Sequence, residues 1–276
     1  MNDLMALKRV QSFNTLLAAY AKVNGGNRFD AIDGGAGSGS TARQIIRYLA
    51  PGQRVHAFEP FPGNHRFFKP EETNILLHPY AMAATPCEMN FRIPSVVQED
   101  SEWGRAGMAG YSSVGYLTSA TPESDKDLVV QCVAADDVVG DSSNIGFVKL
   151  DLQGGELGAL QGMQRILPNV RLMWVEFTFQ PGLVQFLSEH GFTIYDTEYL
   201  MQGEPTSEAM RLFDVTNPRV PLSTGVNAWF GFRRLPWLNY ENDFKAARRD
   251  LGLIQTDLVC VNASHLDEFT AALQHL

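Results

Sequence analysis

Cysteine is scarce in this chain and gives no bonding pattern. The three cysteines, Cys87, Cys132 and Cys260, are odd in number, lie far apart and form no CxxC motif. This usage indicates neither a disulfide framework nor a thiolate zinc site. It fits a reduced environment, so we expect a cytoplasmic protein.

Metal-ligand spacings, basic charge and long apolar runs are also lacking. The six histidines form no HxxxH or comparable spacing, so we predict no metal site. A net charge of -9 argues against the basic surface that nucleic acids require. No run of about 18 apolar residues occurs, and charges interrupt the N-terminal segment, so neither a transmembrane helix nor a signal peptide is expected.

The composition that remains is that of a globular protein. Hydrophobic residues make up 45% and charged residues 19% of 276 residues, enough for one large domain or a domain with additions. Apolar residues at helical spacing predict an N-terminal helix over 1–25. We expect a main domain over 26–235 and an amphipathic, helical C-terminal extension over 236–276.

Strand-like and helical segments alternate through the main domain, which predicts an α/β fold: a mostly parallel sheet with helices on both faces. The expected strands and helices are strands 29–33, 54–59, 74–81, 146–152, 171–177, 192–197 and 226–234, and helices 41–49, 61–68, 155–167 and 183–190. Two further strands, 87–93 and 127–138, have no helix between them. The glycine- and serine-rich segment 101–124 is read as a long loop, which is either a lid over a site or a passive excursion.

A glycine-rich turn, AIDGGAGSGSTA, follows the first strand and precedes a helix. Gly35, Gly37 and Gly39 allow a sharp turn and the close approach of a ligand, which in α/β sheets binds beyond the carboxyl ends of the strands. A dinucleotide fingerprint would require glycine at Ser40. Asp33 would repel a pyrophosphate but suits a ligand with ammonium and sulfonium groups, such as S-adenosylmethionine (SAM). A purely structural turn is the third interpretation.

A second acid, Glu59, ends the next strand. A carboxylate there can accept hydrogen bonds from a ribose diol, and such charge-assisted bonds contribute about 1.5–3 kcal/mol each. The diol occurs in both SAM and NAD, so Glu59 does not separate them. The alternative is a surface glutamate at a strand end.

The stretch FVKLDLQGGELGALQGM places two acids and a glycine pair where a buried strand ends. Asp151 is expected to point into the same crevice as the glycine turn, and Glu156 lies in the first turn of the next helix. The stretch is typical of a floor beneath a reacting centre. Alternatively, Asp151 closes a turn and Glu156 caps the helix.

Four residues are candidates for the base that takes a proton from an acceptor: Asp151, Glu156, Glu176 and His78. Glu176 ends the fifth predicted strand. His78 lies in the third, where a histidine is more often a core or adenine-side residue. Loop residues Tyr111, Ser112, Ser113 and Tyr116 either face a ligand or pack on the domain.

Five stretches in order, AIDGGAGSGS, VHAFEPFPGNHRFF, LHPYAMAA, FVKLDLQGGELGALQGM and LMWVEF, resemble the FkbM-type SAM-dependent methyltransferases. The resemblance covers roughly residues 29–233. The family's pattern K-[IL]-D-x-[EQ]-G-x-E is filled by Lys149, Asp151, Gln153, Gly154 and Glu156. Gln153 stands where glutamate is commoner, and the turn reads Gly-Gly-Ala-Gly where Gly-Ala-Asn is frequent.

The resemblance implies a class I methyltransferase sheet in the order 3-2-1-4-5-7-6, with the seventh strand antiparallel. It implies SAM as cofactor, and O-methylation of a sugar, glycan or secondary metabolite. The cofactor-binding residues it indicates are Asp33, Gly35, Gly37, Gly39, Glu59, Pro60 and Ala81. A homo-oligomer is left open.

Two other functions are considered. An NAD(P)-dependent oxidoreductase predicts a third glycine at Ser40 and a catalytic Tyr/Lys or His constellation, which the sequence lacks. A non-catalytic SAM-fold binding module would keep the glycine turn and lose the acids at the substrate side.

Overall fold

The computed structural model describes residues 13–92, 115–119, 128–140, 144–177, 180, 182–196, 233–234 and 256–275. The chain forms two compact units. The pocket unit is Arg28–Val170, and the terminal unit combines Met1–Asn27 with Arg171–Leu276.

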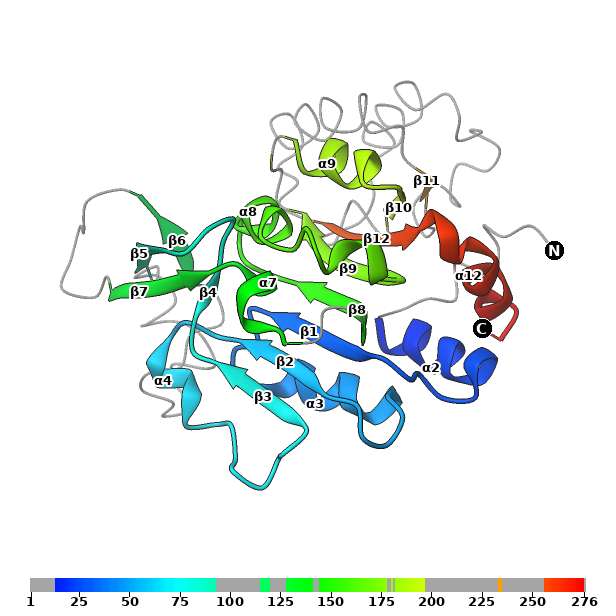
Figure 1. Ribbon diagram of the computed structural model, residues 1–276, viewed down its shortest axis with the longest axis horizontal. Coiled ribbons are helices and arrows are strands. Elements are labelled where there is room, and N and C mark those ends of the chain that lie inside the picture. The colour runs from blue at the N-terminus through cyan, green and yellow to red at the C-terminus, as the bar shows by residue number, and fades with distance from the viewer. Residues whose placement is uncertain are drawn as a thin grey trace, which may run out of the picture. The chain divides into compact units, whose positions relative to one another are not determined.

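Four parallel strands form the main sheet of the pocket unit (Figure 1). They are β1 (Asp30–Gly34), β2 (Val55–Phe58), β3 (Ile75–His78) and β8 (Ile145–Leu150), in the order β8-β1-β2-β3. Every residue of β2 and β8 is buried, as expected where both faces of a parallel sheet are covered. This order confirms the 3-2-1-4 part of the implied sheet.

Short helices connect these strands. They are α3 (Ser40–Ile45), continued by η1 (Ile46–Tyr48), then α4 (Pro62–His65), α7 (Ala135–Val138) and α8 (Glu156–Gln161), with η3 (Leu167–Asn169) after α8. Helix α8 is shorter than the predicted 155–167. It ends at Gln161 and is followed by Gly162, where a Cβ atom would lie 2.1 Å from the Ala83 carbonyl oxygen, so only glycine fits this close contact.

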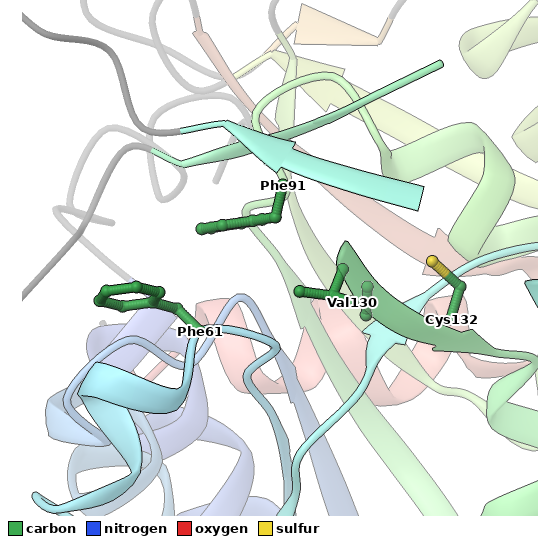
Figure 2. Close-up of a cluster of buried hydrophobic side chains, with 5 residues drawn as sticks. Phe61, Phe91, Val130 and Cys132 are labelled. Atoms are coloured by element: carbon green, nitrogen blue, oxygen red, sulfur yellow. The ribbon is translucent and has the colours of Figure 1, made fainter. Parts of the chain in front are cut away.

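The pocket unit also contains a second sheet, which includes the two further predicted strands, 87–93 and 127–138, although the sequence pattern did not predict a separate sheet. Its strands are β4 (Ala81–Met82), β5 (Cys87–Arg92), β6 (Tyr116–Thr118) and β7 (Leu128–Val133), in the order β4-β7-β5-β6. The predicted strand 74–81 is therefore two strands, separated at Pro79, which has no N–H for a ladder bond. Figure 2 shows the core beneath this sheet, where Phe61 and Phe91 lie near Val130 and Cys132.

The terminal unit holds a sheet of different character. Its elements are α2 (Phe13–Asn24), β9 (Leu172–Phe177), α9 (Leu183–Glu189), β10 (Phe192–Asp196), β11 (Arg233–Arg234), β12 (Thr256–Asn262), η5 (Ala263–His265) and α12 (Leu266–Leu273). The strand order is β11-β10-β12-β9, and β12 is antiparallel to both neighbours. This confirms the implied 5-7-6 order with an antiparallel seventh strand. The sheets are thus parallel only in part.

The seventh strand is not where the sequence pattern placed it. Residues 256–262 were predicted to be helical, but they form β12, whose residues Leu258–Val261 are all buried between two strands. A continuous apolar run of this length fits either a strand or a helix, and here sheet pairing decides. Of the predicted strand 226–234, only β11 lies in the described residues. The helix predicted for the C-terminal extension is confirmed at α12.

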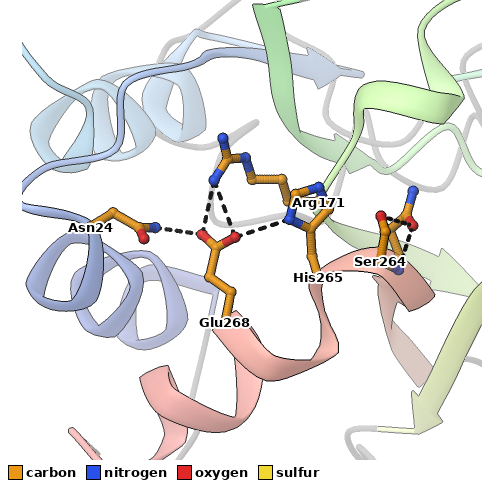
Figure 3. A network of polar contacts seen from close by, with 6 residues as sticks. Asn24, Arg171, Ser264, His265 and Glu268 are labelled. Carbon is orange, nitrogen blue, oxygen red and sulfur yellow. Dashed lines mark hydrogen bonds and ion pairs between the residues drawn. The ribbon is translucent and has the colours of Figure 1, made fainter.

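Helices α2 and α12 pack together in the terminal unit, joined by a polar network around Glu268 (Figure 3). The carboxylate accepts hydrogen bonds from Asn24 and Arg171, and His265 Nδ1 lies 3.0 Å from Oε2. Helix α2 ends at Asn24, as predicted, and residues 1–12 lie outside the described part. No helix in the described ranges is long and apolar enough to cross a membrane.

Candidate active site

An open pocket lies at the carboxyl ends of β1, β2 and β8, where ligands bind in α/β folds. The pocket volume, including the part that is open to bulk solvent, is about 850 Å³. The lining comes from the glycine turn, the end of β2, the second sheet and the β8–α8 turn, as Gly35–Ser38, Ser40, Thr41, Phe58–Pro60, Tyr80–Met82, Phe91, Gly115, Leu117, Lys149 and Asp151–Gln153.

The glycine turn adopts the left-handed backbone that its composition predicts. Gly35, Gly37 and Gly39 have φ of 74°, 55° and 77°. The N–H groups of Gly35 and Ala36 both donate to the Phe58 carbonyl, which fixes the turn to β2. A Cβ atom on Gly35 would lie 1.9 Å from the Asp151 carbonyl oxygen, so the turn passes directly over the end of β8.

Glu59 lies at the tip of β2 and lines the pocket, where the sequence placed it. Its carboxylate accepts hydrogen bonds from the backbone N–H groups of Gly37, at 2.7 Å, and Phe61, at 2.8 Å. Burial raises the pKa of Glu59 to about 7, although these bonds and one from Asn64 oppose the shift. Glu59 therefore also holds the glycine turn, a role that the sequence did not reveal.

Asp33 is placed differently from the prediction. Its side chain is fully buried and is not part of the pocket lining. Asp33 and Lys149 are register partners on the parallel strands β1 and β8, and Lys149 Nζ lies 3.8 Å from Asp33 Oδ1. Neither carboxylate oxygen makes a hydrogen bond of regular geometry, although the Ala42 N–H and Lys149 lie close enough to oppose the rise in its pKa. Burial raises the pKa of Asp33 to about 6, against the attraction of Lys149.

Lys149 lies between two acids and lines the pocket. Its ammonium group contacts Asp151 Oδ2 at 3.2 Å as well as Asp33, and only 9% of its side chain is exposed. Lys149 was predicted only as part of the family pattern, without a role of its own. The signal was the K-x-D spacing, because residues two apart on a strand point to the same face.

Asp151 is held at both oxygens. Lys149 contacts Oδ2, and Gln153 Nε2 donates to Oδ1 at 2.9 Å. Gln153 has a φ of 53°. Among the described residues, it is the one non-glycine residue with a positive φ. Such a left-handed backbone costs about 1–3 kcal/mol, and strain of this kind clusters at functional sites. Both residues line the pocket, as predicted for Asp151.

Glu156 does not face the pocket. The side chain is fully buried and accepts hydrogen bonds from the backbone N–H groups of Leu152, at 2.7 Å, and Gly154, at 3.1 Å. Burial raises its pKa. Glu156 was a candidate for the base, and in the structure its oxygens close the β8–α8 turn. The alternative, a residue that closes the helix start, describes its position.

The remaining candidates are placed elsewhere. Glu176 is buried on β9 of the terminal unit, opposite Asp257 on β12. His78 on β3 stacks on Phe58 and on His56 and is not itself a lining residue of the pocket. Tyr111, Ser112, Ser113 and most of the loop 101–124 lie outside the described residues. In the part of the chain that the structure describes, no three acid, histidine or cysteine side chains cluster as metal ligands.

Of the other predicted cofactor residues, Pro60 and Ala81 line the pocket and Gly39 does not. Gly39 precedes α3 and lies against the Phe68 ring. Its part in the turn is thus to start the helix.

Comparison with known proteins gives a family match and matches among solved structures. Residues 33–195, which include the turn and the β8–α8 segment, match the model of the methyltransferase FkbM domain. Among solved structures, the precorrin-6y C5,15-methyltransferase of Geobacter metallireducens aligns over 92% of this chain and 91% of its own, with a TM-score of 0.35 and 12% identity. No curated protein sequence matches the chain.

Proposed function

The chain belongs to the FkbM methyltransferase family, and from this premise we propose that it transfers a methyl group from SAM to a hydroxyl group of a sugar, glycan or secondary metabolite. The observation that carries the proposal is one pocket that brings together the glycine turn, Glu59 and Asp151. Their order along the chain and their place at the strand ends fit a class I methyltransferase site.

The residues present fit the cofactor. A Cβ at Gly35 would fill the cradle that the turn forms over β8. Glu59 accepts two backbone N–H bonds and one bond from Asn64, and a carboxylate has about four lone-pair directions, so capacity remains for one hydroxyl of a ribose diol. Pro60 and Ala81 complete the wall beside it.

SAM supplies a methyl group on a sulfonium that is already an activated leaving group. The protein's part is therefore to hold the acceptor oxygen in line, which contributes up to about 7–11 kcal/mol. Asp151 is the proposed proton acceptor, a role worth about 10²–10⁴-fold in rate. Lys149 and Gln153 fix the direction of its carboxylate. Glu156 acts only through the turn that it closes.

Calorimetric titration with SAM and with NAD⁺ tests the cofactor. We expect SAM to bind and NAD⁺ not to bind. Glu59→Gln puts an amide donor against the N–H group of either Gly37 or Phe61 and removes the charge, so SAM affinity should fall tenfold or more, about 1.5–3 kcal/mol. Glu71→Gln, at an exposed position nearby, is the matched control and should bind normally.

Binding of NAD⁺ with no binding of SAM would favour the oxidoreductase and refute the proposal. Binding of SAM without methyl transfer to any hydroxylated acceptor would favour the non-catalytic module. Product mass spectrometry against a panel of sugars, glycans and secondary metabolites distinguishes these outcomes, because a transferred methyl group changes the acceptor's mass.

A further inference from the structure

Cys87 and Cys132 are distant in sequence but directly opposed in the second sheet of the pocket unit. They are register partners on the antiparallel strands β5 and β7. Opposed residues on such strands have Cα atoms about 4.5–5.5 Å apart, and a disulfide spans about 4.4–6.8 Å. The backbone therefore already has the separation that a bond between these cysteines requires.

The two side chains also share a face of the sheet. Side chains alternate along a strand, so Cys87 lies on the same face of β5 as Phe91, and Cys132 on the same face of β7 as Val130. Phe91, Val130 and Cys132 belong to one core cluster (Figure 2). The neighbouring pair on the opposite face, Glu88 and Gln131, is joined by a hydrogen bond of 2.6 Å, which confirms this register.

We propose that Cys87 and Cys132 are a redox modification site, which a hydroperoxide converts to a cross-strand disulfide beside the pocket wall. Both are free thiols, so the bond has yet to form. The proposal does not depend on the methyltransferase function. It requires only the strand pairing and the access of an oxidant.

The two cysteines are unequal, and this sets the order of the reaction. Cys87 is exposed and Cys132 is buried. Burial raises the pKa of Cys132 to about 12, and the charge and hydrogen bond of the facing Cys87 thiol add to the shift. Because the thiolate is the reactive form, Cys132 does not react first.

The balanced reaction has two steps. The Cys87 thiolate attacks one peroxide oxygen, an S–O bond forms, the O–O bond breaks, and the released hydroxide takes a proton to become water. Cys132 sulfur then attacks the Cys87 sulfenic sulfur. The S–S bond forms, the S–O bond breaks, and the departing hydroxide takes the Cys132 proton. Two thiols are oxidised, one molecule of hydrogen peroxide is reduced, and two molecules of water leave.

The bond would form next to the pocket. Cys132 is also the register partner of Ala81 on β4, and Ala81 lines the pocket. Phe91, four residues after Cys87 on β5, lines it too. Ala81, Cys132 and Cys87 thus form a row across three strands.

The test is oxidation of the full chain with hydrogen peroxide, followed by denaturation, alkylation of free thiols and peptide mass spectrometry without reduction. We expect a linked peptide pair containing Cys87 and Cys132, and parallel loss of alkylation at both, reversed by dithiothreitol. Cys260 is fully buried on β12 of the terminal unit and should stay free, so it serves as the internal control.

Two variants make the test decisive. In Cys87→Ser, at an exposed position, the same peroxide treatment should leave Cys132 reduced, whereas Cys260→Ser should still form the linked pair. The proposal is overturned if Cys87 of the wild-type chain proceeds to sulfinic or sulfonic acid while Cys132 remains alkylated. Oxidation of Cys132 in Cys87→Ser, or a bond between two chains, would overturn it as well.

Discussion

Gly35 and Gly52 share a left-handed backbone but differ in their surroundings. Comparing substitutions at the two positions therefore distinguishes the cost of backbone strain from the cost of a steric contact. Their φ values are 74° and 89°. A Cβ on Gly35 would lie 1.9 Å from the Asp151 carbonyl oxygen, whereas a Cβ on Gly52 meets nothing within 4 Å.

We therefore expect Gly52→Ala to destabilise the protein by about 1–2 kcal/mol through backbone strain alone. Gly35→Ala should cost about 2–5 kcal/mol, since overpacking adds to strain, and should abolish SAM binding. Urea unfolding and calorimetry measure both effects. Equal losses in the two variants would show that the contact with Asp151 is unimportant.

Removing the charge of Asp151 tests whether this residue takes the proton. Asp151→Asn keeps the shape of the side chain and removes its charge. If Asp151 takes the proton, the rate should fall about 10²–10⁴-fold while SAM still binds. A smaller fall, partly in KM, would indicate positioning by hydrogen bonds. Normal turnover would show that Asp151 is not the base.

Single residues differ in how far the sequence predicted their place. Gly35 and Glu59 follow from the strand–turn–helix pattern, since their position depends on local backbone. Asp33 and Glu156 were misplaced because residue type does not show which way a side chain turns. Asp33 faces Lys149 only because β1 and β8 pair in that register.

Among the elements, helix α3 supports the glycine turn through Arg43, which contacts the turn at Ser38. The Arg43 guanidinium donates to both carboxylate oxygens of Glu72 and, at 2.8 Å, to the Ser38 carbonyl oxygen. Arg43 lowers the pKa of Glu72 to about 2, so the pair stays charged in mild acid. A partly exposed pair of this kind contributes only about 0–1 kcal/mol to stability.

Arg43→Lys keeps the charge and loses the forked geometry. We expect little change in the unfolding midpoint but weaker SAM binding, because Ser38 lines the pocket. Arg47→Lys, at an exposed position one turn later, is the control. Unchanged affinity in Arg43→Lys would show that the turn holds its shape without this contact.

Strands β2 and β3 contain a histidine pair that makes stability depend on pH. His56 Nδ1 and His78 Nε2 lie 3.0 Å apart. Burial, and then repulsion from His56, lowers the pKa of His78 to about 4, and burial lowers that of His56. As pH falls from about 6.5 towards 4, the unfolded chain binds protons that the folded pair does not, so this contribution to stability is lost.

Asp33 and Glu59 act in the opposite direction. Their pKa values are raised to about 6 and about 7, so their contribution is present in acid and is lost as pH rises through that range. The difference between wild type and His78→Gln isolates the histidine. We expect the variant to lose less unfolding free energy between pH 7 and 5, measured by urea titration. Parallel profiles would contradict this.

Buried parallel strands were predicted well, because β2 and β8 are apolar throughout and have turn residues at their ends. Strands β5 and β7 were predicted too, but their pairing in a separate sheet and the position of β12 were not, since these depend on partners distant in the sequence. Tyr116–Thr118 gives too short a pattern to be read as a strand. The lid predicted over 101–124 stays a prediction.

For the molecule as a whole, the terminal unit draws on both ends of the sequence. Glu268 on α12 holds Asn24 of α2 and Arg171 before β9 (Figure 3). The predicted division into 1–25, 26–235 and 236–276 stays a prediction. The two compact units are defined differently, by which residues pack against one another.

Glu268→Ala should lower the unfolding free energy by about 1–3 kcal/mol, because it leaves Arg171 and Asn24 without their shared acceptor. Asp267→Ala, in the same helical turn but exposed, should change it by no more than about 0.5 kcal/mol. Chemical denaturation of both variants gives the comparison. Equal effects would mean that the network adds nothing beyond helix-terminal charge.

The position of β12 has a consequence for biosynthesis. This strand lies between β9 and β10, although it is translated about 60 residues after β10. A nascent chain that has emerged only as far as β10 must keep the edges of β9 and β10 free from each other until the last strand arrives. During that interval on the ribosome, the unfilled gap is a template for wrong strand pairing, and ribosome-bound chaperones would find their substrate there.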